Sequence, residues 1–219
     1  MNKINSKTDF RPKNNQELVL LIESEIDEHG SQCDLNHIDT SLVTDFFELF
    51  YGSGFNGNIS KWNVSGVRAM GSMFESSQFN GDISKWNVSG VKEMGAMFYN
   101  SKFNGDISKW DISGVEIMCS IFAESKFNGD ISRWDVSSVK TMDSMFSESD
   151  FSRDVSGWSR SSVSSDEHMF LHSEIAKKIG TLDPSFECVK SYFLNLHLEA
   201  SLQKDSRGKC RPSQPRVRL

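Results

Sequence analysis

The chain has 219 residues, of which 25% are charged, and its formal net charge is −6. Residues 204–219 hold six Lys and Arg against one Asp, so the preceding body is strongly acidic. An acidic body argues against a protein that wraps nucleic acid, because neutralising phosphates requires Lys and Arg on the contact face. A length of this order is enough for one domain with a sizeable core.

Residues 1–30 are predicted to form a flexible leader followed by an N-terminal capping helix. Asn14 and Glu17 have the spacing of a capping box, with Asn in the place of Ser or Thr. Leu18, Ile22 and neighbouring apolar residues then recur at helical spacing, and Gly30 ends the pattern. We expect this helix to cover one end of the fold.

The leader has no apolar segment that would serve as a signal peptide, and no run of the sequence is long enough to span a bilayer. We therefore expect a cytoplasmic protein, with the cell surface or secretion by a non-classical route as the alternative. Four cysteines without Cys-x-x-Cys spacing indicate reduced thiols, with a Cys188–Cys210 bridge as a minor option.

A 24-residue period dominates the middle of the chain. All five tryptophans keep it, and so do two columns of phenylalanine. The tryptophans are Trp62, Trp86, Trp110, Trp134 and Trp158. A period of this length indicates stacked units that bury their apolar sides against one another. We divide residues 31–174 into a degenerate first repeat (31–54), regular repeats (55–150) and a decaying repeat (151–174).

Each repeat changes its pattern midway. In residues 83–88 the spacing of Ile83, Trp86 and Val88 predicts a short strand, with the Trp column pointing inward as a buried spine. Residues 91–98 carry apolar side chains three and four positions apart, which predicts a short helix. The expected fold is an α/β repeat solenoid, a leucine-rich-repeat-like horseshoe of 24-residue strand-plus-short-helix units with helical caps at both ends.

After the repeats, residues 175–203 are predicted to form a C-terminal helical cap. The Asp183-Pro184 pair is typical of a helix start, and apolar residues follow it. Residues 204–219 are basic and contain two prolines, so we expect a disordered tail.

The repeat strings resemble a known family. FNGDISKWNVSGVKEMGAMF and FNGDISRWDVSSVKTMDSMF are similar to the leucine-rich-repeat-like units of the bacterial surface protein A type, including the related mycoplasma lipoprotein repeat family. The resemblance covers residues 31–174. It implies a non-enzymatic bacterial surface protein that holds other proteins.

The candidate binding site consists of polar residues that alternate with the inward-pointing ones on the expected concave face. These are Lys61, Asn63, Lys85, Asn87, Lys109, Asp111, Arg133 and Asp135. Stacked repeats would align them as ladders of like groups that grip a partner protein. The alternative is a solvated surface whose regularity reflects duplication.

Other columns of the repeat are weaker candidates for binding sites. The Asp82/Asp106/Asp130/Asp154 column offers a low-probability calcium site, although the spacing of calcium-binding repeats is absent. The Asn56, Asn80, Asn104 and Asn128 column is expected to satisfy turn backbone groups. His168 and His172 are expected to be surface residues more often than metal ligands. No cofactor is expected, and no residue pattern indicates catalysis.

The sequence therefore predicts a non-enzymatic protein-binding scaffold, with no small-molecule substrate. One alternative is a non-classically exported surface adhesin or secreted effector that binds a host protein. Another is an acidic decoy of a nucleic-acid-binding protein, which would need a continuous negative field. Nucleic-acid binding is expected at most through the basic tail.

Overall fold

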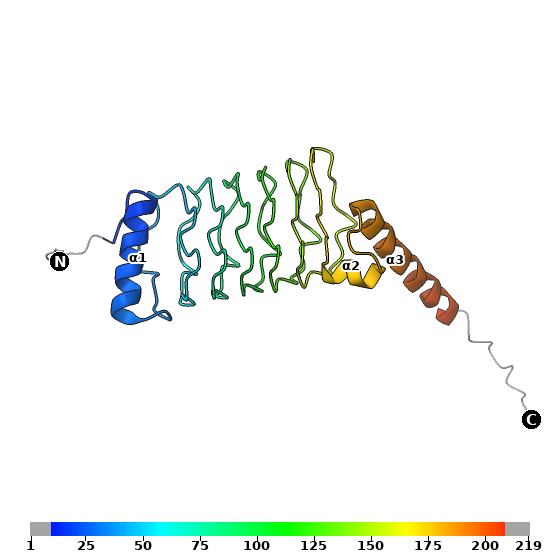
Figure 1. Cartoon of the computed structure of the whole chain (residues 1–219), viewed down its shortest axis with the longest axis horizontal. Helices are drawn as coiled ribbons and strands as arrows, with labels where there is room; N and C mark the ends of the chain where they lie inside the picture. The colour runs from blue at the N-terminus through cyan, green and yellow to red at the C-terminus, as the bar shows by residue number, and fades with distance from the viewer. Residues whose placement is uncertain (1–9, 209–219) are drawn as a thin grey trace, which may run out of the picture.

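The computed structural model describes residues 10–208, which contain three helices. Helix α1 (Asn15–His29) lies at one end, and helices α2 (Glu174–Ile179) and α3 (Phe186–Gly208) lie at the other. Between them the chain winds through a column of stacked turns (Figure 1). We call each 24-residue turn of this column a coil. The six coils are residues 31–54, 55–78, 79–102, 103–126, 127–150 and 151–174.

The predicted fold class is wrong: the chain is not an α/β repeat solenoid or a leucine-rich-repeat horseshoe. The described residues contain no named strand and no sheet, and each coil lacks the short helix that was expected. Parallel backbone pairing is limited to six isolated bridges, such as Ala69 with Glu93 and Glu93 with Ile117. The coils are therefore built from turns.

The segment predicted as a strand folds into turns within its own coil. The backbone N–H of Trp86 donates to the carbonyl of Ile83 at 3.1 Å, and that of Val91 donates to Val88 at 2.9 Å. A ladder strand would direct these donors to a neighbouring chain segment. The predicted alternation of buried and exposed residues is present in this segment, but it arises from tight turns and not from a strand.

The segment predicted as a helix is a pair of turns that bonds to the next coil. The N–H groups of Met94, Ala96 and Phe98 donate to carbonyls 23 residues further on, at 2.8–3.0 Å, whereas that of Met97 donates to Met94. A helix would direct every one of these donors four residues back. Ala96 has a φ of 54°, in the left-handed region, as do equivalent non-glycine residues in the other coils. Because of these left-handed residues, every second backbone N–H group of the segment points to the next coil instead of along its own coil.

Two side-chain columns strengthen the stacking. The backbone N–H of Asn104 donates to Oδ1 of Asn80 at 2.8 Å, and that of Asn128 donates to Oδ1 of Asn104 at 2.9 Å. The indole Nε1 of Trp110 donates to the carbonyl of Ile83 in the preceding coil at 3.1 Å. The prediction that the asparagine column satisfies turn backbone groups is confirmed.

The core runs through the centre of the column. The five tryptophans are each 4% exposed, which confirms that they form a buried spine. Phenylalanine rings stack along it, with 5.6 Å between the ring centroids of Phe74 and Phe98 and 5.7 Å between those of Phe98 and Phe122. A column of buried serines borders them, and Ser125 Oγ donates to the carbonyl of Phe122. Nothing in the repeat pattern had predicted that these serines would be buried.

Both ends of the core are covered by helices. Leu18 and Ile22 of α1 are buried, and Glu17 N–H donates to Asn14 Oδ1 at 2.9 Å, which confirms the predicted cap. At the other end Phe186 is buried, and the guanidinium of Arg160 lies 3.9 Å from its ring centroid.

Helix α3 includes residues 204–208, where the predicted tail begins. Residues 1–9 of the predicted leader and 209–219 of the tail, including Cys210, lie outside the described part of the chain.

Candidate functional site

The eight predicted contact residues lie on one surface of the column, which we call the polar ladder. Its members are Lys61, Asn63, Lys85, Asn87, Lys109, Asp111, Arg133 and Asp135. All eight side chains are exposed, and the residues between them in each coil, such as Trp86 and Val88, are buried. The ladder lies on a turn-built surface and not on the strand face that was expected.

The Asn and Asp members of the polar ladder are held by the turns in which they lie. In Asn87 and Asp111, Oδ1 accepts a hydrogen bond at 2.7 Å from the hydroxyl of the serine two residues later, and it also accepts the backbone N–H of that serine. This hydrogen bonding lowers the pKa of Asp111 and of Asp135 below the ordinary value. These side chains are fixed, and both aspartates are ionised at neutral pH.

The basic members form no salt bridge, but three of them lie near a carboxylate of the same coil. The pKa values of Asp82, Asp106 and Asp130 are lowered by hydrogen bonds from their own turns and, to a smaller extent, by the charges of Lys85, Lys109 and Arg133. Lys61, Lys85, Lys109 and Arg133 are exposed, and none forms an ion pair with another residue of the described range. Four coils therefore present a column of exposed cations without salt bridges beside a column of fixed amide and carboxylate groups. No salt bridge of the described residues would have to break for an ionic group to approach this surface.

A second surface was not predicted. It consists of the residues of each coil that border the inter-coil bridges, and we call it the turn face. It comprises residues 45, 47, 48, 51 and 52 and their equivalents at multiples of 24. These positions contain no Lys or Arg in any of the six coils. Their acidic residues are Asp45, Glu48, Glu75, Glu93, Glu124, Asp143, Glu148 and Glu167.

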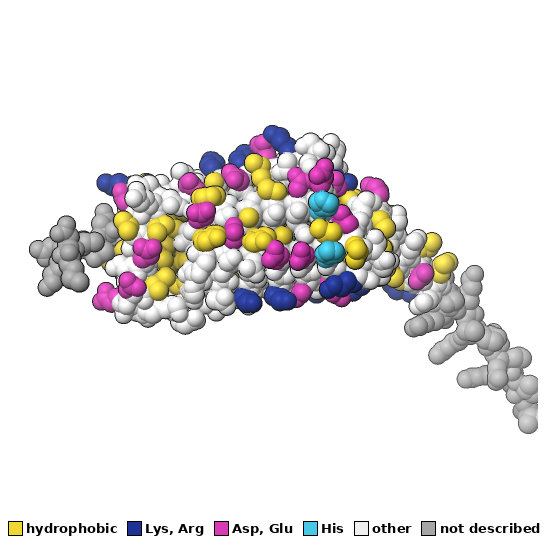
Figure 2. Space-filling model, viewed as in Figure 1, with side chains coloured by type: hydrophobic (Ala, Val, Ile, Leu, Met, Phe, Trp, Pro, Cys, Tyr) yellow, Lys and Arg dark blue, Asp and Glu magenta, His cyan; other side chains and the backbone are white. Residues whose placement is uncertain are grey.

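Acidic and hydrophobic side chains share a band along the face shown in Figure 2, with Lys and Arg at its edges. On the turn face the phenol of Tyr99 donates to a carboxylate oxygen of Glu124. This hydrogen bond, followed by partial burial and the charges of Glu124, Glu75 and Glu148, raises the pKa of Tyr99 to about 12. The signal for this surface was present in the sequence, because aligning the 24-residue repeats shows that the five columns of the turn face contain no Lys or Arg.

The other candidates are accounted for by local contacts. The aspartates of the proposed calcium column accept backbone hydrogen bonds, as Asp106 Oδ1 does from Ser108 N–H at 2.9 Å. His168 Nδ1 lies 2.8 Å from Asp183 Oδ2, which raises the pKa of the imidazole. Within residues 10–208 no group of three or more His, Cys, Asp or Glu side chains is arranged to hold a metal ion.

The thiols are separate from one another. Cys33, Cys119 and Cys188 are free, and burial raises the pKa of Cys33 and of Cys119. This burial does not favour the thiolate form that a reactive cysteine needs.

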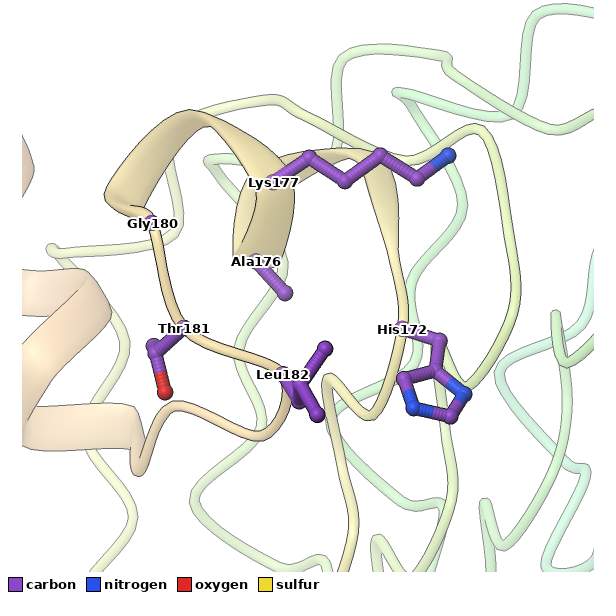
Figure 3. Close-up of a pocket in the computed structure, with 6 residues that line it drawn as sticks. All are labelled: His172, Ala176, Lys177, Gly180, Thr181 and Leu182. Carbon is purple, nitrogen blue, oxygen red and sulfur yellow. The ribbon is translucent and has the colours of Figure 1, made fainter.

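An open pocket of 340 Å³ lies between α2 and the last coil. His172 and Lys177 lie on one side of it, with Ala176 and Leu182 supplying apolar surface (Figure 3). Leu182 is 71% exposed, so the pocket is shallow. It offers one imidazole and one amine but no arrangement of a nucleophile and a base.

Comparison with known proteins gives one match. A family model described as "Mycoplasma protein of unknown function, DUF285" matches residues 24–125 and 100–185. No curated protein and no solved structure matches the chain. The match agrees with the mycoplasma part of the resemblance and gives no support to the bacterial surface protein A or leucine-rich-repeat part. No helix of the described range is long and apolar enough to cross a membrane.

Proposed function

We propose that this chain, which belongs to the mycoplasma protein family of unknown function DUF285, is a non-enzymatic scaffold that binds a partner protein through the polar ladder. The observation that supports the proposal is that this surface repeats the same pair of exposed side chains and that one member of each pair is held in place by hydrogen bonds. The four coils of residues 55–150 each repeat an exposed cation followed two residues later by an amide or carboxylate whose Oδ1 is fixed by its own turn.

The order of the surface matters because ordering exposed side chains opposes binding. Immobilising a flexible side chain at an interface costs about 0.5–1.5 kcal/mol. The serine hydrogen bonds to Asn63, Asn87 and Asp111 have already restricted these side chains before any partner arrives. The buried tryptophans beneath them anchor the same segments to the preceding coil. A partner would therefore need to order the Lys and Arg side chains of the polar ladder, whereas its Asn and Asp side chains are already held.

The test is a charge reversal that leaves the turns intact. Lys85→Glu with Lys109→Glu changes two exposed side chains that form no salt bridge, whereas alanine at Asn87 or Asp111 would also remove turn hydrogen bonds. The control is Lys102→Glu with Lys178→Glu, which makes the same change in net charge at exposed positions outside the ladder. Proteins captured by the wild-type chain are identified and purified, and their Kd is then measured by calorimetry.

We expect the ladder variant to raise the Kd at least tenfold and the control variant to change it less than threefold. Equal effects of the two variants would mean that net charge, and not this surface, determines binding. Finding no protein whose affinity depends on Lys85 and Lys109 would exclude the proposal.

A further inference from the structure

The histidines of this chain lie only near the two ends of the column. All five are outside residues 38–167, so none lies in the four regular coils. Histidine is the side chain whose charge ordinarily changes between pH 5 and 8, so an imidazole forms an ion pair with a carboxylate only while it is protonated. Four of the five are paired in this way: His29 and His37 with Glu25, His168 with Asp183, and His197 with Asp154.

At the C-terminal end, two of these pairs hold the segment that covers the last coil. We call residues 182–204, which include most of α3, the closing segment. Nδ1 of His168 in the last coil lies 2.8 Å from Oδ2 of Asp183, and Nε2 of His197 in α3 lies 2.9 Å from Oδ2 of Asp154 in the last coil. Toward its C-terminal end α3 leads away from the column (Figure 1). The two pairs therefore enclose the part of the closing segment that lies against the coil.

The remaining charged contacts at this end do not respond to pH between 5 and 8. Arg160 pairs with Asp166 of its own coil and lies over the ring of Phe186. Lys177 pairs with Glu174 within α2. Arginine and lysine stay protonated throughout this range. Among the residues whose side chains the structure describes, only the two histidine pairs join the last coil to the closing segment by an ion pair.

The charged groups that act on His168 are all carboxylates. Its hydrogen bond to Asp183 and the charge of Asp183, with smaller effects of Glu167 and Asp143, raise the pKa of the imidazole, against a small opposing effect of desolvation. Because the pKa is higher in the folded chain than in the unfolded one, the stabilising contribution is complete below the unfolded value. It is lost as the pH rises through the folded value.

The other pair connects α3 directly to the coil. The neighbours of His197 one turn away along α3 are uncharged. On the coil side, Oδ1 of Asp154 accepts the backbone N–H of Ser156 at 2.8 Å, while Oδ2 faces the imidazole. Arg153, next to Asp154 in sequence, donates to the carbonyl of Asn128 at 2.9 Å. The carboxylate that meets His197 is therefore held in place by its own turn.

We propose that the closing segment is a pH-dependent latch, which covers the last coil more firmly when His168 and His197 are protonated and opens more often as the pH rises. Opening exposes Phe186, Val189 and Phe193, which are buried in the closed state. An exposed ion pair changes an equilibrium by about 1.5-fold to fivefold, so we expect about a fivefold effect of two pairs on one segment. The latch does not involve the polar ladder, so the two proposals can fail separately.

The experiment is amide hydrogen exchange of the full-length chain at pH 5.5 and pH 8.0, read by mass spectrometry. After correction for the intrinsic exchange rate at each pH, the protection of an amide reports how rarely its segment opens. We expect the protection of α3 to fall about fivefold from pH 5.5 to pH 8.0. Residues 79–126 contain no histidine, and their protection should change less than twofold.

Three variants test which groups are responsible. His168→Gln with His197→Gln removes both charges, so α3 should show low protection at both pH values. His168→Lys with His197→Lys keeps both charges at pH 8.0, so α3 should stay highly protected at both. His172→Gln is the matched control, because this residue is exposed in the same coil and its imidazole forms no ion pair with a described residue. It should keep the wild-type response.

Three results would overturn the proposal. Equal protection of wild-type α3 at the two pH values would exclude the latch. A pH response that persists in the double Gln variant would assign the effect to other groups. An equal fall in the protection of residues 79–126 would show that the whole fold responds to pH, and not the closing segment.

Discussion

Replacing Trp110 by alanine is the most direct test of the coil architecture. Trp110 is 4% exposed, and its indole N–H donates to the Ile83 carbonyl of the preceding coil. A tryptophan buries up to about 250 Å², which at about 25 cal/mol per Å² is an upper limit of roughly 6 kcal/mol. Alanine keeps part of that area, and large-to-small core substitutions of this kind cost about 3–5 kcal/mol. We expect a loss of about 4 kcal/mol.

The assay is urea unfolding followed by circular dichroism, which gives the free energy of unfolding of each variant. Trp110→Phe separates the hydrogen bond from the packing: it keeps a large ring but leaves the Ile83 carbonyl without this donor, at a cost of about 1–2 kcal/mol. Lys109→Ala, at the exposed position next to it, should change stability by less than about 0.5 kcal/mol. A loss below about 1 kcal/mol for Trp110→Ala would refute the buried spine and the stacking based on it.

Three further predictions concern turns and charges. Gly105→Ala should destabilise the fold by about 1–3 kcal/mol in the same assay, because the added Cβ would lie 2.8 Å from the Phe103 ring. Gly157→Ala is the control, since its Cβ would meet nothing within 4 Å. Equal losses of stability in the two variants would contradict the packing of the turn. Glu124→Gln should lower the pKa of Tyr99 from about 12 toward 10, since it removes the carboxylate that accepts the phenol's hydrogen bond. Absorbance at 295 nm follows this titration, and an unchanged pKa would exclude the hydrogen bond. The polar-ladder aspartates have pKa values below their ordinary 3.8 in the folded chain, so their contribution to stability is present above pH 3.8 and is lost as the pH falls through the folded values. Unfolding midpoints measured from about pH 5 to about pH 2 should therefore fall below pH 3.8, and Asp111→Asn should flatten that fall; an unchanged slope in this variant would contradict the prediction.

Much of the core could be predicted from the sequence because its period fixes which residues share an environment. Trp110 and its equivalents lie in one column, and only a stack of units can bury all of them in the same way. The cap at Asn14 and Glu17 was also predictable, since its interactions are local. The asparagine column followed from the need of every turn for a hydrogen-bond acceptor.

The path of the backbone could not be predicted in the same way. The alternation of Trp86 and Val88 suits a strand, but it suits two tight turns equally well. The deciding features are left-handed conformations at Ala96 and Asn100. Asparagine is enriched in this conformation, but alanine is not, and the equivalent positions of other coils hold Ser, Glu and His. The spacing of apolar side chains predicts which residues are buried. The direction in which each N–H group points depends on the backbone φ and ψ angles, and the spacing does not determine these angles.

The sequence predicted the polar ladder but not the turn face. The polar ladder was chosen from an expected strand face, and its side chains are exposed although that strand does not exist. The turn face was missed because residues 91–98 were assigned to a helix, which distributed their neighbours around a cylinder. Once the turns are recognised, Glu75 and Glu124 belong to one continuous surface.

The bonds between coils also limit how this chain can change in length. In the turn segment of the first five coils, the N–H groups that donate to the next coil alternate with those that donate within the coil, and residues with positive φ recur in the same register. Inserting a single residue would exchange the two sets of donors and place left-handed torsion angles at positions where the next coil does not match them. Adding or removing a whole 24-residue unit would leave every partner in place. Related chains should therefore differ by complete coils, with the helical ends retained to cover whatever number of coils lies between them.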